Sequence, residues 1–313
     1  MPEWLYEAGI GEARAALIVD GAIIEAAIEL PTPLRLGMVA PARLVELTAG
    51  GMGRLDMDGE EAVIARIPPG VTKGATLTVE IVREAIPEPG RPKPPRATAS
   101  DASPHPGADL LARLQAGGHP VRRLRAHEPD ALEHAGWSEL LEEAMSGAIA
   151  FPLGALRMSP TPAMTLFDVD GPPPLDPLAI GAARAVAMAI RRHAIGGSIG
   201  VDFPTLANKS ARQAVAEAID ASLPLPFDRT AMNGFGFLQI VRPRLRASLP
   251  ELLHADPAAA AVRAMLRRLE REPPGSPLRH RLPAAHHAVL AKHPDWVADL
   301  ARRTGVTHQL ESA

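Results

Sequence analysis

The sequence predicts a mixed protein of the α+β and α/β classes, built from more than one unit. Two apolar runs joined by Asp20-Gly21 are typical of a β-hairpin. Several short β-prone runs between Leu36 and Ala85 indicate a small barrel. A strand, a helix and a second strand are predicted between Thr165 and Phe203. At 313 residues, the chain is long enough for more than one core.

The composition excludes several classes of site. Apolar residues make up 46% of the chain, which indicates a folded protein, whereas aromatic residues make up only 3%. No cysteine is present, so disulfides, Cys-ligated zinc and thiol catalysis are excluded. The net charge of −3 gives no global nucleic-acid signature, so a polyanion site would need a local basic patch. The N-terminus has no signal pattern and no apolar run approaches membrane-spanning length, so we expect a cytoplasmic protein without a membrane partner.

The first elements follow from turn and proline signals. The apolar runs of residues 14–29 form the predicted hairpin, and the barrel that follows has about the size of an oligonucleotide-binding fold. Residues 87–106 are rich in proline and carry Arg91, Lys93 and Arg96, which is typical of an extended linker with solvated cations. Residues 107–147 have leucines at helical spacing, interrupted by the basic cluster Arg122, Arg123 and Arg125, which we interpret as surface.

The C-terminal third contains a strand that ends in arginines. A helix is expected over 209–221, and an alternating strand follows and leads into Arg242, Arg244 and Arg246. Extended geometry would place the three arginines on one face, where they could contact phosphates, although a solvated surface is the plainer interpretation. The tail from residue 257 is predicted as a helix, a Pro-rich turn, a second helix and a short strand at 306–310.

The unit from Thr165 to Phe203 holds the candidate site. In an extended segment, Asp168 and Asp170 share one face, and Asp202 ends the second strand. The helix between the strands has Asp176 as its expected N-cap and Pro177 as its first residue. Neighbouring strands could bring Asp168 and Asp202 together at one edge of a sheet. Mg²⁺ takes one or two carboxylates plus water and phosphate, although most strand-end aspartates only cap helices or face solvent.

Three motifs, in this order, resemble the ribonuclease E/G family. The run from Phe151 to Gly171 looks like the family's strand pair followed by Ile-Asp-Val-Asn-Ser-Gly. Gly-Gly-Ser-Ile-Gly-Val-Asp-Phe, ending at Phe203, is similar to its Gly-Gly-Ile-Ile-Val-Ile-Asp-Phe. Phe-Gly-Phe-Leu-Gln-Ile-Val-Arg, ending at Arg242, is similar to its Phe-Gly-Leu-Leu-Glu-Met-Thr-Arg. The first hairpin and the terminal run 302–311 also have counterparts, so the resemblance spans nearly the whole chain.

The resemblance implies a domain organisation. A ribonuclease-H-like region would comprise residues 1–35 and 107–160, the second part with a reduced 5′-monophosphate sensor. An S1 barrel would occupy 36–90, a basic linker 91–106, a DNase-I-like catalytic region 161–250 and a small C-terminal domain 251–313. Because the zinc link between protomers is absent, a homo-oligomer would not depend on zinc.

The resemblance also implies a function, which is Mg²⁺- or Mn²⁺-dependent endonucleolytic cleavage of single-stranded RNA. Asp168 and Asp202 would bind the metal, and Asp170 stands where the family has an asparagine that orients the metal water. Lys93, Arg96, Arg242 and Arg244 are the expected RNA contacts. Leu55 and Val63 replace the barrel aromatics that hold a base. The alternative is a catalytically decayed homologue that only binds RNA.

Overall fold

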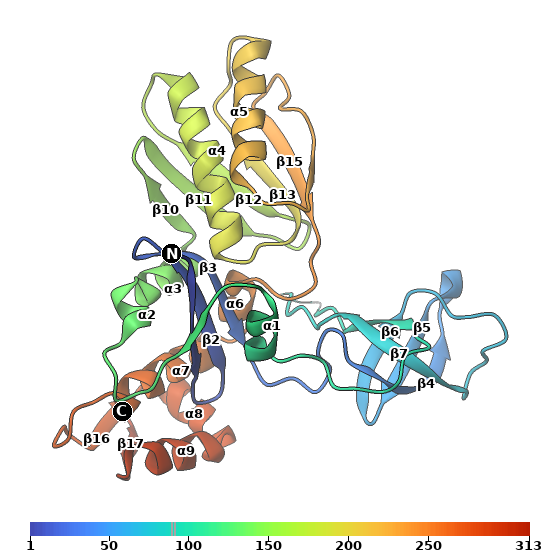
Figure 1. Ribbon diagram of the computed structural model, residues 1–313, viewed down its shortest axis with the longest axis vertical. Coiled ribbons are helices and arrows are strands. Elements are labelled where there is room, and N and C mark those ends of the chain that lie inside the picture. The colour runs from blue at the N-terminus through green and yellow to red at the C-terminus, as the bar shows by residue number, and fades with distance from the viewer. Residues whose placement is uncertain (89, 91) are drawn as a thin grey trace.

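The computed structural model describes residues 1–88, 90 and 92–313, and it is a mixed α+β structure that includes a closed barrel. Figure 1 shows the barrel standing to one side, while the largest sheet and its helices lie at the opposite end from the C-terminal helices. Arg91, one of the expected linker cations, lies outside the described residues. In the described part of the chain, every helix is too short or too polar to cross a lipid bilayer.

A four-stranded sheet forms around the predicted hairpin, which is confirmed. The strands lie in the order β3-β2-β1-β9, and Asp20 and Gly21 both take positive φ, as a tight hairpin turn requires. The strands of this sheet are β1 (Glu3–Ala8), β2 (Ala13–Val19), β3 (Ala22–Glu29) and β9 (Val121–Arg123). The chain between the barrel and the next sheet adds α1 (Leu110–Ala116), α2 (Ala131–His134) and α3 (Trp137–Ser146). The basic cluster at Arg122 and Arg123 therefore belongs to strand β9.

The predicted barrel is confirmed as a closed barrel of five strands. They are β4 (Val39–Leu47), β5 (Gly53–Met57), β6 (Glu60–Ile64), β7 (Thr76–Arg83) and β8 (Arg96–Ala99), with the 3-10 turn η1 (Ala49–Gly51) between β4 and β5. Strand β8 pairs with both β6 and β7 and so closes the barrel. This strand lies inside the segment 91–106 that the proline content predicted to be a linker. Residues 96–103 contain no proline, which leaves residues 96–99 free to join the ladder.

The largest sheet has six strands in the order β10-β11-β12-β13-β15-β14. They are β10 (Ala148–Phe151), β11 (Gly154–Pro160), β12 (Thr165–Asp170), β13 (Gly197–Asp202), β14 (Asp228–Arg229) and β15 (Phe237–Arg242). Helices α4 (Leu175–Arg192) and α5 (Lys209–Ser222) cover the same face of this sheet (Figure 1). The predicted strand–helix–strand unit is therefore confirmed. Its helix begins before Asp176, with Pro174 as the N-cap, so the expected cap residue lies in the first turn.

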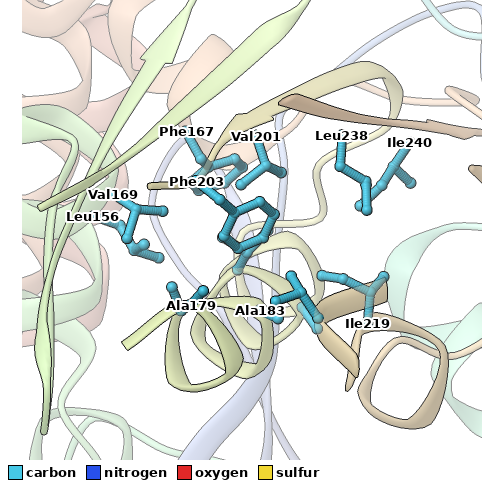
Figure 2. Close-up of a cluster of buried hydrophobic side chains, with 14 of the residues drawn as sticks. Leu156, Phe167, Val169, Ala179, Ala183, Val201, Phe203, Ile219, Leu238 and Ile240 are labelled. Atoms are coloured by element: carbon cyan, nitrogen blue, oxygen red, sulfur yellow. The ribbon is translucent and has the colours of Figure 1, made fainter. Parts of the chain in front are cut away.

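The covered face of this sheet holds the largest core. Figure 2 shows Phe167, Val201 and Leu238 pointing from the strands toward the two helices. Helix α4 presents alanines to the sheet, among them Ala179 and Ala183, which are completely buried. Small side chains let the helix approach the strands closely, which suits a chain with few aromatic residues. The other face of the sheet carries no helix and holds the candidate site.

The C-terminal part packs against the first sheet through buried charges. It comprises α6 (Leu249–Ala255), α7 (Pro257–Glu270), β16 (Arg279–Leu282), α8 (Ala284–Lys292), α9 (Pro294–Thr304) and β17 (Gln309–Ser312). On α7, Arg263 lies 2.9 Å from Glu12, and Arg267 lies 3.5 Å from Glu7. The predicted terminal strand lies later than expected, at Gln309–Ser312, where it pairs with β16, which the Pro-rich segment did not predict.

Candidate metal centre and nucleic-acid interface

Asp168 and Asp202 lie directly opposite each other on neighbouring parallel strands. The register of β12 and β13 pairs these two residues at the last position where the strands are in contact. Adjacent strands are about 4.8 Å apart, and residues in register point to the same side of a sheet. The expectation that the two carboxylates meet at one edge of the sheet is confirmed.

Local sequence alternation keeps both carboxylates out of the core. Phe167, Val169 and Val201 point into the helix-covered face and are buried, whereas Asp168 and Asp202 are exposed on the opposite face. Asp170 is also exposed, two residues further along β12, and pairs with Ala155. Two residues advance a strand by roughly 6.6 Å, so Asp170 stands beside the pair without being part of it.

Asp168 and Asp202 form no close ion pair with any residue that the structure describes. Among the residues that the structure describes, no Lys, Arg or His nitrogen lies within 4.0 Å of a carboxylate oxygen of Asp168, Asp170 or Asp202. Arg157 of β11 is opposite Asp168 in the antiparallel register, and it is exposed on the same face. Like charges directly opposite each other destabilise a sheet. The arrangement is therefore one that an added cation would relieve.

The donor set fits a hard divalent ion that keeps most of its water. In the described parts of the chain, no group of three or more His, Cys, Asp or Glu residues could hold a metal ion. Mg²⁺ instead binds through one or two carboxylates and leaves its other positions to water and substrate phosphate. Asp168 and Asp202 meet that requirement.

An aromatic and apolar surface adjoins Asp202 on the side away from Asp168. Phe237 is opposite Asp202 in the β13–β15 pair. Its ring lies over Gly200, where an added Cβ would come within 2.7 Å of the Phe237 Cζ and 2.8 Å of the Leu166 Cδ2. Sequence reasoning missed Phe237 and Arg157 as neighbours of the aspartates. Both residues lie within the motifs of the family resemblance. Only the register of strands β11, β12, β13 and β15 shows that Arg157 and Phe237 flank Asp168 and Asp202.

The expected RNA contacts Lys93 and Arg96 lie at the end of the barrel. Lys93 pairs with Ile86 through two backbone hydrogen bonds, and its Nζ lies 2.6 Å from the Glu88 Oε1. Arg96 begins β8 and is exposed. Its charge, together with that of Arg244, helps to lower the pKa of Arg83, although burial is the largest cause. Lys93 is thus already neutralised, whereas Arg96 presents its charge to solvent.

The structure does not bring Arg242 and Arg244 to the aspartates. Arg242 pairs with Gly197 at the opposite end of β13 from Asp202. It also alternates with Leu238 and Ile240, so it lies on the helix-covered side of the sheet.

Arg244 lies beyond the end of strand β15, so the expectation that Arg242, Arg244 and Arg246 share one extended face is wrong. The Arg244 guanidinium is 2.6 Å from Glu88 and is also paired with Glu251, and Arg246 is 3.0 Å from Glu84. Strand alternation stops where the strand stops, and the ion pairs then decide where each guanidinium points.

Leu55 and Val63, which stand where the family has base-holding aromatics, differ in burial. Leu55 is 1% exposed and belongs to the barrel core, so no side chain at this position could reach a base without unfolding the barrel. Val63 is half-buried on the neighbouring strand β6. The register pairs Leu55 with Ala62, and so the two positions lie on different sides of the barrel wall.

Comparisons of the sequence with known protein families and with curated proteins found no similar protein. A scan against models of protein families found no match, and a search among curated proteins found no relative.

Proposed function

We propose that this protein is a metal-dependent endoribonuclease that cleaves single-stranded RNA, as a diverged member of the ribonuclease E/G family. The in-register pair of exposed aspartates, Asp168 and Asp202, carries the proposal. The three motifs of the resemblance fall on β10 to β12, on β13 and on β15, which are contiguous in one sheet. In this proposal that sheet is the DNase-I-like region, the five-stranded barrel is the S1 domain and the first sheet is the ribonuclease-H-like region.

The residues of the open sheet face have separate tasks in the proposed reaction. Asp168 and Asp202 would hold Mg²⁺ or Mn²⁺, which supplies an activated water and stabilises charge on the phosphate when bound. Asp170, two residues further along β12, would be placed to orient such a water as a hydrogen-bond acceptor. Arg157, opposite Asp168, donates its guanidinium N–H groups to a phosphate oxygen.

Two cations at the barrel contact the RNA strand outside the reacting centre in this proposal. Arg96 is already exposed. Lys93 would first have to leave its ion pair with Glu88 and bind a phosphate instead.

Arg242 and Arg244 have no part in this interface. Arg242 lies at the far end of the sheet, and Arg244 is held between two carboxylates with only 20% of its side chain exposed. A phosphate would have to displace both Glu88 and Glu251 from Arg244. Retention of those ion pairs explains the arginine better than RNA contact does.

Replacement of the two aspartates tests the proposal. Asp168→Asn and Asp202→Asn should each reduce Mg²⁺-dependent cleavage of a labelled single-stranded RNA by more than about a hundredfold, since even residues that only support metal ligands contribute 10–100-fold. Asp228→Asn is the matched control, because Asp228 is exposed on the same sheet and pairs with Val241 at the end remote from Asp202. Cleavage at the wild-type rate by either site variant would refute the assignment.

RNA binding without cleavage is the second candidate function. The observation in its favour is that the described residues supply two carboxylates in register and no cluster of three or more metal-binding side chains. Titration calorimetry with Mn²⁺ and Mg²⁺ separates the candidates. Saturable binding in the wild type that disappears in Asp202→Asn supports the enzyme, whereas RNA binding without any metal binding supports the second candidate.

A further inference from the structure

Phe235 stands out among the aromatic residues because it is almost fully exposed. The chain has six Phe, three Trp and one Tyr, all within the part that the structure describes. Phe235 is 84% exposed, and each of the others is buried or half-buried. Burial of a phenylalanine side chain contributes about 1.5–3 kcal/mol, so leaving this ring in water forgoes a stabilising term of that size.

The backbone on both sides of Phe235 is held in place by the turn that carries it. The Asn233 Oδ1 accepts hydrogen bonds from the backbone N–H of Phe235 at 2.9 Å and of Phe237 at 3.0 Å. Gly236 has φ of +100°, and a Cβ at this residue would lie 2.1 Å from the Phe203 carbonyl oxygen. The backbone is thus fixed on both sides of Phe235. Sequence reasoning missed this residue, although Asn-Gly-Phe-Gly marks a turn that presents one aromatic side chain.

The same turn is attached to the candidate metal centre. The Gly236 carbonyl oxygen accepts a hydrogen bond of 3.1 Å from the backbone N–H of Phe203, the residue after Asp202. Phe237, the residue after the turn, lies opposite Asp202 in the sheet. Phe235 is therefore exposed on the turn that precedes β15, at the same end of the sheet as Asp202.

We propose that Phe235 stacks against a nucleobase of single-stranded RNA next to the phosphate held at Asp168 and Asp202. This inference rests on the proposed function and adds the residue that positions the strand. Residues 36–99, which form the barrel, contain no aromatic side chain, so base stacking has to come from elsewhere in the chain. Every nucleobase has an exposed π-face when unpaired, and stacking on an aromatic side chain contributes about 1–3 kcal/mol per base. That gain is comparable to the burial energy that the exposed ring forgoes.

A cycle of protein and ligand changes tests the stacking. The probes are a fluorescently labelled oligouridylate of about 12 nucleotides, within the usual site sizes for single strands, and a strand of equal length and charge without bases. Fluorescence anisotropy without divalent ions measures binding and avoids cleavage. The variants are Phe235→Ala, Phe235→Trp and the control Val241→Ala, whose side chain is 47% exposed on the same sheet.

We expect Phe235→Ala to weaken oligouridylate binding by roughly 5- to 150-fold, the equivalent of 1–3 kcal/mol, and to leave binding of the base-free strand unchanged. Phe235→Trp should keep the preference for bases, and Val241→Ala should behave as the wild type does. Equal losses on both strands, a change of less than twofold, or no binding by the wild type would overturn the inference.

The outcome is independent of the metal assignment. If Asp168→Asn and Asp202→Asn abolish cleavage while Phe235→Ala has no effect, only the stacking inference fails. If Phe235→Ala removes base recognition while both aspartate variants cleave normally, the assignment of the metal centre fails and the stacking residue stands.

Discussion

Two groups of charged residues in this molecule differ in whether their charges have close ion-pair partners. On the open sheet face, Asp168 and Asp202 are in register and exposed, and among the described residues no cationic nitrogen lies within 4.0 Å of either carboxylate. At the barrel junction, defined here as Glu84, Glu88, Lys93, Arg244, Arg246 and Glu251, every charge has a partner within 4.0 Å. Glu88 alone is paired with both Lys93 and Arg244.

The difference between the groups indicates what each one does. Paired charges at the barrel junction join segments that are far apart in the chain, such as Glu88 and Arg244, and so hold the barrel against the rest of the molecule. Like charges in register on the open face repel each other and add no stability by themselves. The arginines after β15, which the sequence presented as phosphate ligands, belong to the first kind. The predictions that follow test this contrast through stability.

The largest effect is expected from the loss of Arg244. Arg244→Gln removes the cation that Glu88 and Glu251 share, although Lys93 still pairs with Glu88. We expect the free energy of unfolding to fall by about 2–3 kcal/mol, somewhat less than for a fully buried pair. Urea denaturation measures the change. The control is Arg54→Gln, which breaks the exposed pairs with Glu46 and Glu61 and should cost about 1 kcal/mol or less. Equal effects of the two substitutions would contradict the structural role of the barrel junction.

A smaller effect concerns acid sensitivity at Glu88. Burial raises the pKa of Glu88, but hydrogen bonds from Lys93 and Arg244 outweigh burial, so the pKa lies below its usual value of 4.5. A carboxyl group with a lowered folded-state pKa contributes stability above its unfolded pKa, and this contribution disappears as pH falls through the folded pKa. The stability difference between wild type and Glu88→Gln should therefore be constant above pH 5.5 and shrink as pH falls below about 4.5. If the stability difference between wild type and Glu88→Gln instead grows as the pH falls, the pKa of Glu88 is raised in the folded protein and not lowered.

On the open face, removal of a charge should stabilise the protein. Asp202→Asn relieves the repulsion from Asp168, so without divalent ions we expect the free energy of unfolding to rise by up to about 1 kcal/mol. Mg²⁺ at about ten times its dissociation constant should add roughly 1.4 kcal/mol to the wild type only. The order of stability should therefore reverse when Mg²⁺ is added. If Asp202→Asn is less stable than the wild type without divalent ions, repulsion between the Asp168 and Asp202 carboxylates does not destabilise the protein.

The smallest change in stability is expected at Lys93, whose side chain is 41% exposed. Lys93→Gln should alter the free energy of unfolding by no more than about 0.5 kcal/mol, because Lys93 is partly exposed and Glu88 keeps its ion pair with Arg244. If Lys93 exchanges Glu88 for a phosphate, the same variant should reduce the slope of log binding constant against log salt by about 0.7. An unchanged slope would show that Lys93 contacts no phosphate and serves only in the ion pairs of the barrel junction.

The sequence by itself determined the local features of the site. Alternation of apolar and polar residues places Asp168, Asp170 and Asp202 on the face opposite the core, because period-two geometry needs no knowledge of distant residues. The turn at Asp20-Gly21, the run of barrel strands and the helix between β12 and β13 also follow from neighbouring residues. The absence of cysteine excluded thiolate chemistry before any fold was known.

Only the tertiary structure decided which residues meet. The register that pairs Asp168 with Asp202, and Asp202 with Phe237, depends on the packing of three strands against two helices. The pairing of Arg244 with Glu88 joins positions 156 residues apart, a separation at which no local pattern carries information. Exposure of Phe235 likewise depends on the Asn233 turn being anchored beside Phe203. Periodicity fixes which face a side chain occupies, whereas long-range packing and charge pairing determine its partner on that face.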